Sequence, residues 1–149
     1  ETAGGAAAGN MAIYSTPSGA WSVPAIGVDG ADSWVTALSV LPGGDVLVGG
    51  YFNLAGGPPA ASTARYSPAS GAWSSTGSVT GVEVYTFASL SSGGVITGGY
   101  FTAIGGVAGR NIARFNVSTS SWSALAGYGM DVSSSGLTRL SNGGLIVAG

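Results

Sequence analysis

The sequence predicts an all-β protein built from a repeated unit, and three observations support this prediction. Residues 48–52 return 49 positions later as residues 97–101, and both segments end in Gly-Gly-Tyr-Phe. Residues 64–73 return as residues 113–122, again 49 positions later, and an earlier copy lies at residues 12–21. No segment keeps the 3.6-residue apolar period of a helix over ten or more residues. A fixed period without helical patterning is typical of repeated β units.

Each unit is predicted to contain four short strands. In the copy that begins near residue 35, a first strand at Val35–Leu41 is followed by a turn with two glycines. A second, β-branched strand at Val46–Phe52 ends in the glycine pair, and a Gly/Pro-rich loop leads to a third strand at Ser62–Ser67. The turn at Pro68–Gly71 then leads into a fourth strand that opens at Trp73.

The repeated residues identify the kind of unit. A glycine pair ends the second strand, an aromatic residue lies in the third, and a tryptophan follows seven positions later. These positions are Gly49-Gly50 and Gly98-Gly99, then Tyr14, Tyr66 and Phe115, then Trp21, Trp73 and Trp122. The pattern resembles blades of the kelch or galactose-oxidase type of β-propeller. It resembles still more closely the propeller repeats of large secreted bacterial proteins and of fungal cortical polarity-marker proteins. This resemblance implies a cell-surface or extracellular setting, with an engineered protein as the alternative.

The repeated glycines and aromatics have a structural interpretation. A residue without a Cβ atom permits close approach of a neighbouring backbone or a β-bulge, so we expect the glycine pairs to serve one of these purposes. We expect the repeated tryptophans and their aromatic partners to pack between neighbouring blades rather than to bind a ligand.

The chain is expected to hold three blades' worth of strands. Residues 1–24 supply the second half of a blade, residues 34–76 and 83–125 supply whole blades, and residues 134–149 supply a first half. Residues 2–7 match residues 102–108 with one position absent. Because propellers have about 4–8 blades, two copies with two hybrid blades would close a six-bladed homodimer. The alternatives are a piece of a longer propeller and a nine-bladed trimer.

Composition excludes several classes of function. The chain has no Cys and no His, which argues against zinc, thiol and histidine chemistry and against the copper site of galactose oxidase. Four cationic residues against six acids leave no basic stripe for nucleic acid. No apolar run approaches the roughly 20 residues of a spanning helix, and no signal peptide is visible. We expect no cofactor.

Catalysis is not expected either. The acids Asp29, Asp32, Glu83 and Asp131 lie in or near loops that lead into first strands, at positions that the repeats do not share. A glycosidase needs two carboxylates about 5–10 Å apart, and the sequence shows no such pairing. Residues 29–33 have the oxygen-rich look of a calcium loop, and Asn116 opens a formal glycosylation sequon, but both segments are expected to be turns.

A few residues remain as candidates for ligand binding. Trp34, Tyr85 and Tyr128 are aromatics that the repeats do not share, while Arg65 and Arg114 occupy equivalent third-strand positions. Aromatic faces among hydroxyl and amide groups suit carbohydrate. The sequence therefore predicts a non-catalytic propeller scaffold or recognition module that closes its ring by association, with a lectin-like glycan binder as the alternative.

Overall fold

The computed structural model describes residues 2–29, 32–127 and 129–149. Every regular element in this part of the chain is a strand, which confirms the all-β prediction, and it contains no helix that could cross a membrane. The strands are β1 (Thr2–Ala3), β2 (Ala6–Ala7), β3 (Ile13–Ser15), β4 (Ala20–Ser22), β5 (Val28–Asp29), β6 (Trp34–Val40), β7 (Val46–Tyr51), β8 (Leu54–Ala55), β9 (Thr63–Ser67), β10 (Ala72–Ser75), β11 (Val79–Ser89), β12 (Val95–Ile104), β13 (Val107–Ala108), β14 (Ile112–Asn116), β15 (Ser121–Ala124), β16 (Gly136–Arg139) and β17 (Leu145–Ala148).

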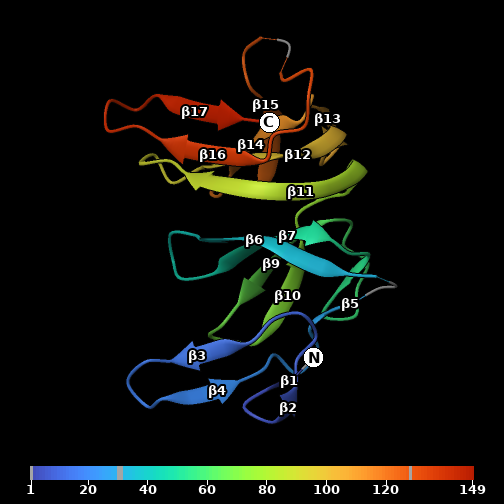
Figure 1. Ribbon diagram of the computed structural model, residues 1–149, viewed down its shortest axis with the longest axis vertical. Helices are drawn as coiled ribbons and strands as arrows, with labels where there is room; N and C mark the ends of the chain where they lie inside the picture. Colours follow the sequence, from blue (N-terminus) through green and yellow to red (C-terminus); the bar gives the residue numbers. More distant parts are fainter. Residues whose placement is uncertain (1, 30–31, 128) are drawn as a thin grey trace.

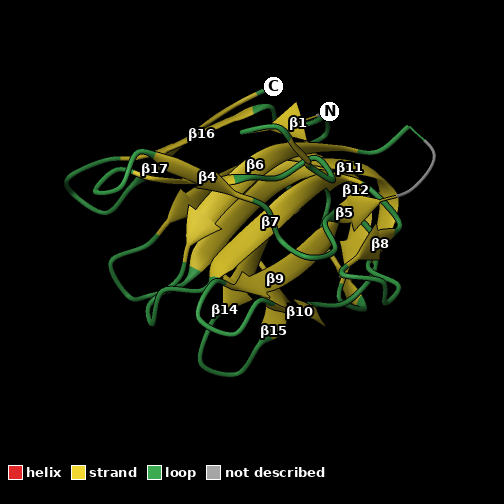
Figure 2. Cartoon of the chain, turned by 90° about the horizontal axis from the view of Figure 1, so that it is seen from below, coloured by secondary structure: helices red, strands yellow, loops and turns green. Residues whose placement is uncertain are grey.

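Two antiparallel meanders form the middle of the molecule. Their strand orders are β6-β7-β9-β10 and β11-β12-β14-β15, with β13 added beside β12. The sheets stack face to face along the long axis, with β3–β4 beyond one side and β16–β17 beyond the other (Figure 1). Viewed along this axis, the strands of successive sheets overlie one another, as successive propeller blades do (Figure 2).

Each meander has two unlike ends. The tight turns β6–β7, β9–β10, β11–β12 and β14–β15 share one end, which we call the hairpin end. The connections from second to third strand and from one sheet to the next share the other, which we call the linker end. The first strands β6 and β11 contact each other, and so do β11 and β16, which places the first strand of every sheet along one side of the stack.

Side-chain hydrogen bonds join the first strands of the two meanders. Ser39 and Ser89 share a hydroxyl–hydroxyl bond of 2.9 Å, and the Thr36 hydroxyl donates to the carbonyl of Val84. These bonds connect β6 directly to β11, so neighbouring sheets are fixed to each other by polar contacts as well as by apolar packing.

The two glycines of each pair serve different purposes. A Cβ atom at Gly49 would lie 2.6 Å from side-chain atoms of Val84 and Phe87 in the next sheet. A Cβ atom at Gly50 would instead meet the carbonyl oxygen of Trp34 in its own sheet, where a register shift interrupts the β6–β7 ladder. Gly50 therefore fits the expected bulge, whereas the atoms that approach Gly49 belong to side chains and not, as expected, to a neighbouring backbone.

The second copy repeats this division. A Cβ atom at Gly98 would lie 2.9 Å from the Cβ atom of Ser134, which precedes β16. A Cβ atom at Gly99 would meet the carbonyl oxygen of Glu83, beside the register shift of the β11–β12 ladder.

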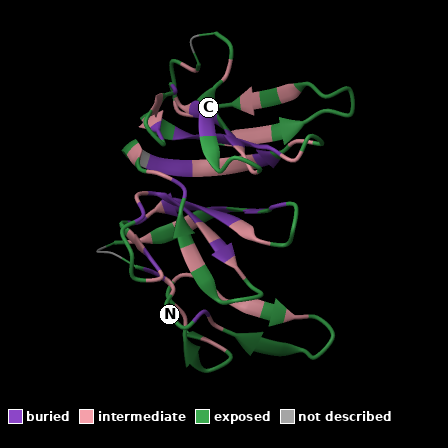
Figure 3. Cartoon of the chain, turned by 180° about the vertical axis from the view of Figure 1, so that it is seen from behind, coloured by how far each residue is buried: buried purple, intermediate pink, exposed green. Residues whose placement is uncertain are grey.

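Each of the two meanders buries apolar side chains on both of its faces, so the apolar core lies between neighbouring sheets. Leu41 and Leu47 of one meander pack with Val84, Phe101 and Phe115 of the next. Two further clusters lie on either side of this one, against β3–β4 and against β16–β17. Burial is accordingly concentrated in the two meanders, whereas the outlying hairpins are largely exposed (Figure 3).

The repeated tryptophans join the apolar clusters between neighbouring sheets. Trp122 shares a cluster with Leu47 of the preceding meander, and Trp73 packs against the cluster that lies towards β3–β4. Trp73 also lies over Gly56 and Trp122 over Gly105, and each indole reaches the linker that precedes its own meander. The Trp73 Nε1–H group donates to the carbonyl of Ile26 at 2.9 Å, and that of Trp122 donates to the carbonyl of Thr76 at 2.6 Å. The tryptophans therefore fasten the fourth strand to the connection between sheets.

Two expectations need correction. β11 begins at Val79 and pairs with β12 as far as Ile104, so Glu83 lies inside a strand rather than in a loop before it. In the β1–β2 hairpin Thr2 pairs with Ala7, as Ala103 pairs with Ala108. Thr2 therefore corresponds to Ala103 rather than to Thr102, and no position is absent from that hairpin.

Candidate functional site

The structure separates the ligand candidates that the sequence proposes. Trp34 and Tyr85 lie on the neighbouring first strands β6 and β11, whereas Arg65 and Arg114 lie on the third strands β9 and β14. Tyr128 lies outside the described residues. The aromatic and the cationic candidates therefore do not form one site.

Trp34 is held by two contacts at the linker end of β6. Its ring stacks on Tyr51 at a centroid distance of 4.9 Å, and its Nε1–H group donates to a carboxylate oxygen of Glu83. Glu83 is buried. The partial burial of Tyr85 itself, together with the negative charge of Glu83, raises the pKa of Tyr85 above its ordinary value. Trp34 remains 44% exposed, so one part of its ring is still open to a ligand.

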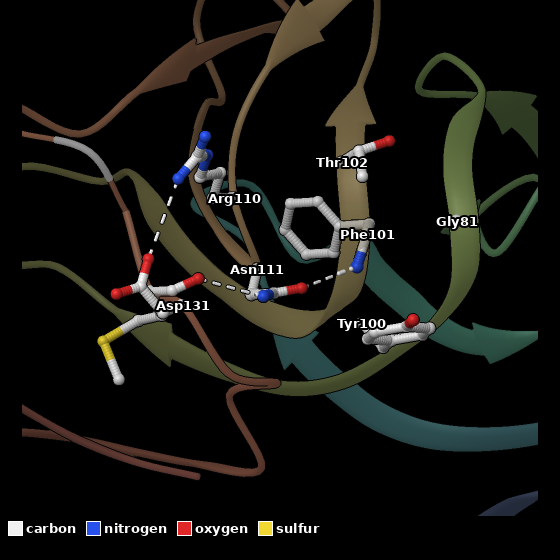
Figure 4. Close-up of a pocket in the computed structure, with 8 residues that line it drawn as sticks. Gly81, Tyr100, Phe101, Thr102, Arg110, Asn111 and Asp131 are labelled. Carbon is white, nitrogen blue, oxygen red and sulfur yellow. Dashed lines mark hydrogen bonds and ion pairs between the residues drawn. The ribbon is translucent and has the colours of Figure 1, made fainter.

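A pocket of about 300 Å³ lies at the linker end of the second meander, and we call it the tyrosine pocket. Its walls come from β12, from the turn before β14, from the linker to β16 and from Gly81 of β11 (Figure 4). The side chains that shape it are those of Tyr100, Phe101, Thr102, Arg110, Asn111, Met130 and Asp131.

The side chain of Asn111 connects two walls of this pocket. Its backbone has a φ of 60°, a left-handed conformation that asparagine adopts more readily than most residues. The side-chain oxygen accepts from the amide of Phe101 at 3.0 Å, and the side-chain nitrogen donates to the carbonyl of Met130 at 3.0 Å. Asn111 thus ties the end of β12 to the linker that forms the opposite wall.

Sequence analysis missed this asparagine, although a signal was present. Asn10 and Asn111 each lie four positions before the repeated aromatic of the third strand. Asn10 adopts the same conformation, with a φ of 58°, and its side chain donates to the carbonyl of Val28 at 3.1 Å. In two of the three copies an asparagine thus ties the start of the third strand to the following linker, whereas the first meander has Ser62 at this position with a similar φ of 62°.

The rim of the tyrosine pocket carries groups that can bind a polar ligand. Tyr100 is 53% exposed, and the Arg110 Nη1 atom lies 3.7 Å from Asp131 Oδ1. A ring face, a hydroxyl group of Thr102 and a solvent-exposed ion pair form a combination that can stack on and hydrogen-bond a hydroxylated ligand.

A second pocket, of about 470 Å³, lies at the hairpin end between the two meanders, and we call it the arginine pocket. Arg65 comes from one meander, and Ser92, Arg114, Asn116 and Ser118 come from the other. This pocket therefore brings two of the sequence-predicted candidates together, at the end of the sheets opposite to the tyrosine pocket.

The carboxylates of Asp45, Glu83 and Asp131 lie in three separate places rather than beside one another. Asp45 bonds Arg65 at the hairpin end, Glu83 bonds Trp34 inside the stack, and Asp131 faces Arg110 at the linker end. No group of three metal-binding side chains occurs in the described part of the chain. The expected turn at Asn116 is present, because its side-chain oxygen accepts from the amide and the hydroxyl of Ser118. The segment 29–33 lies partly outside the described residues.

Comparison with known proteins gives one finding. A family model described as the Rax2 C-terminal beta propeller domain matches residues 11–144 of the chain. No curated protein matches it significantly.

Proposed function

Since the chain belongs to the Rax2 C-terminal beta propeller domain family, we propose that it is a non-catalytic recognition module of a closed propeller. Ligands would bind at the two ends of its sheets, and the sheets themselves would serve as a rigid support. The dispersed carboxylates favour binding over catalysis, because hydrolysis of a glycoside needs two of them held close together. The family and the repeat pattern both favour a place at the cell surface or outside the cell, and nucleic acid is not a proposed partner.

Ring closure is supported by the unequal exposure of aromatic residues that occupy the same position in different copies of the repeat. Tyr14 and Trp21 of the β3–β4 hairpin are 50% and 53% exposed, whereas their counterparts Phe115 and Trp122 are 0% and 6% exposed. In the complete sheets the third strand pairs with a second strand, but β3 pairs only with β4. Strands equivalent to β16 and β17, supplied from outside, would cover this edge.

A second copy of the chain is the proposed source of those strands. It would place its β17 beside β3 and close six blades with two-fold symmetry, within the usual range of about 4–8 blades. By register, β17 corresponds to the first half of β12, and β1 to the end of β12. Two copies of residues 1–149 alone would leave the hybrid blade without counterparts of Tyr100 and Phe101, and Phe101 is buried. We therefore expect two such segments to associate through an incompletely filled interface.

Light scattering on a size-exclusion column tests this assembly. A mass near twice 14.4 kDa that persists on dilution would support closure by a second copy. A variant extended by Tyr-Phe after Gly149 should associate more tightly, because the added phenylalanine fills the empty core position. A monomer in both forms would contradict closure by a second copy and would leave further strands of a longer chain as the source.

Carbohydrate is the second candidate ligand, and the tyrosine pocket favours it. Tyr100 offers a half-exposed ring beside Thr102, Arg110 and Asp131. On a glycan array, the unchanged protein should bind a defined set of sugars, and Tyr100→Ala should abolish that binding. Tyr51→Ala is the matched control, since Tyr51 is the equivalent residue of the first meander and already stacks on Trp34. Equal losses in both variants would argue against the tyrosine pocket.

A further inference from the structure

The repeat supplies an internal comparison for the arginine pocket. Arg65 and Arg114 occupy equivalent positions on β9 and β14, 49 residues apart, yet their surroundings differ. The Arg65 Nε atom lies 2.7 Å from Asp45 Oδ2. Hydrogen bonds from Ser67 and from Arg65 hold the pKa of Asp45 below its ordinary value, so this carboxylate stays ionised and neutralises its arginine.

Arg114 has no such carboxylate. The residue that corresponds to Asp45 is Gly94, and both close the same turn: Leu41 N–H donates to the Asp45 carbonyl at 2.7 Å and Leu90 N–H to the Gly94 carbonyl at 2.8 Å. The Arg114 guanidinium donates a long hydrogen bond of 3.4 Å from Nη2 to the Ser92 hydroxyl. Among the described residues, no carboxylate forms a salt bridge with Arg114.

Charge is also distributed unevenly between the two ends of the sheets. Arg65, Arg114 and Arg139 lie towards the hairpin end, and there Arg139 donates to the hydroxyl of Ser91 at 3.0 Å. Of the acidic residues that the structure describes, Asp45 alone lies at the hairpin end. The others lie towards the linker end: Asp29, Asp32, Glu83 and Asp131. The hairpin end is thus positive although the whole chain has a net charge of -2.

We infer that the arginine pocket binds an oxyanion, such as the carboxylate or sulfate group of an acidic ligand, through the guanidinium of Arg114. A planar guanidinium binds carboxylate or sulfate oxygens through two parallel N–H donors, and neighbouring hydroxyl groups can donate further bonds. Ser92 lines the same pocket, and its hydroxyl accepts from Arg114 and so keeps its own proton to donate, whereas the Ser118 hydroxyl already donates to Asn116. The ligand anion would take the place that the Asp45 carboxylate occupies beside Arg65.

Backbone amide NMR of the unchanged protein, titrated with sodium sulfate and separately with glucuronate at constant ionic strength, tests this inference. Shifts should saturate at residues 92–94 and around Arg114, with chloride as the competitor that maintains ionic strength. Saturation with glucuronate alone would identify a carboxylate site, and saturation with both would identify a general oxyanion site. Shifts that follow ionic strength rather than the anion would contradict the inference.

Two variants test the role of Arg114 in different ways: one removes its guanidinium, and the other places a carboxylate beside it. Arg114→Ala should weaken binding by about tenfold or more, the scale of one charge-assisted hydrogen bond. Gly94→Asp keeps the arginine but installs the carboxylate that the first meander has, and should weaken binding equally. Asp45 already occupies the equivalent turn position, and a Cβ atom at Gly94 would lie 3.2 Å from Arg114 Nε and from the Phe115 carbonyl oxygen, so the change also requires a small shift of the guanidinium.

The reverse change provides the matched control. Asp45→Asn frees Arg65 and should strengthen oxyanion binding or add a second site. Unchanged affinity in both Gly94→Asp and Arg114→Ala would overturn the inference, provided that their NMR spectra show the native fold. The result is independent of ring closure, since the pocket lies within a single chain.

Discussion

The hairpins β3–β4 and β14–β15 carry the same sequence phrase but differ in how deeply they are buried. The ring centroids of Tyr14 and Trp21 lie 5.0 Å apart, and the two ring planes make an angle of 51°. For Phe115 and Trp122 the centroid distance is 4.9 Å and the angle is 49°. The local geometry is therefore nearly identical. Exposure differs because β14 also pairs with β12 and packs against the preceding meander, whereas β3 pairs with β4 alone. A hairpin determines its own cross-strand pair, but only its neighbours determine whether that pair becomes core.

The largest expected effect comes from truncating the buried aromatic. Phe115→Ala should lower the free energy of unfolding by about 3–5 kcal/mol, because it opens a cavity in a closely packed cluster. Tyr14→Ala should cost about 1 kcal/mol, as an exposed residue does. Urea denaturation measures both values. If the cost of Tyr14→Ala increases with protein concentration, a second copy covers this residue; equal costs at high dilution would contradict the comparison.

Overpacking between the meanders should have the next largest effect. Gly49→Val places atoms where Val84 and Phe87 of the next sheet lie, and should destabilise by about 1–3 kcal/mol. Gly136→Ala is the control, because a Cβ atom there meets only that of Ala148, at an ordinary 3.5 Å. Thermal unfolding followed by circular dichroism should show a lower Tm for Gly49→Val and little change for Gly136→Ala. Equal midpoints would show that the sheets adjust to the added side chain.

Removal of one indole donor should have a smaller effect. Trp122→Phe keeps an aromatic ring over Gly105 but leaves the carbonyl of Thr76 without its indole partner, at a cost of about 1–3 kcal/mol. Trp21→Phe changes a half-exposed residue and should cost less than about 0.5 kcal/mol. Urea denaturation of both variants, compared at equal protein concentration, separates the two positions. A larger loss in Trp21→Phe would mean that β4 is buried in solution.

The smallest effect concerns pH. Because hydrogen bonds from Ser67 and Arg65 lower the pKa of Asp45 in the folded protein, its ionised form stabilises the fold above the ordinary pKa of an aspartate, and this contribution is lost as the pH falls through the lowered value. Asp45→Asn should therefore narrow the difference in Tm between neutral and strongly acidic buffer. The second meander, with Gly94 at this position, makes no such contribution. An unchanged difference in Tm would contradict a pH-dependent contribution from Asp45.

Much of the fold could be predicted from the sequence because the repeated residues show where strands end and which residues pair. The glycine pairs, the third-strand aromatics and the following tryptophans mark strand ends and cross-strand pairs, which depend on local geometry. The hydrogen bonds of Trp73 and Trp122 to the linkers were not predicted, because the recurrence of a tryptophan does not say which backbone carbonyl its indole reaches.

The candidate sites were less accessible to sequence analysis. Glu83 looks like a loop acid until β11 is seen to extend back to Val79, and its contact with Trp34 joins two different sheets. The tyrosine pocket depends on a linker whose path the repeat does not specify. The missing acid beside Arg114 could have been found by aligning Asp45 with Gly94, since both residues occupy the same place in the repeat. What escaped prediction lies mainly where two units meet.

The contact of Gly49 with the next sheet has a consequence for the curvature of the whole ring. Since a side chain at this point would push β11 away from β7, the absence of one allows a small wedge angle between successive blades on that side. The wedge angle in turn fixes how many blades complete a full circle. Side chains at Gly49 and Gly98 would open this angle, so the two glycines help to set the curvature of the stack of sheets.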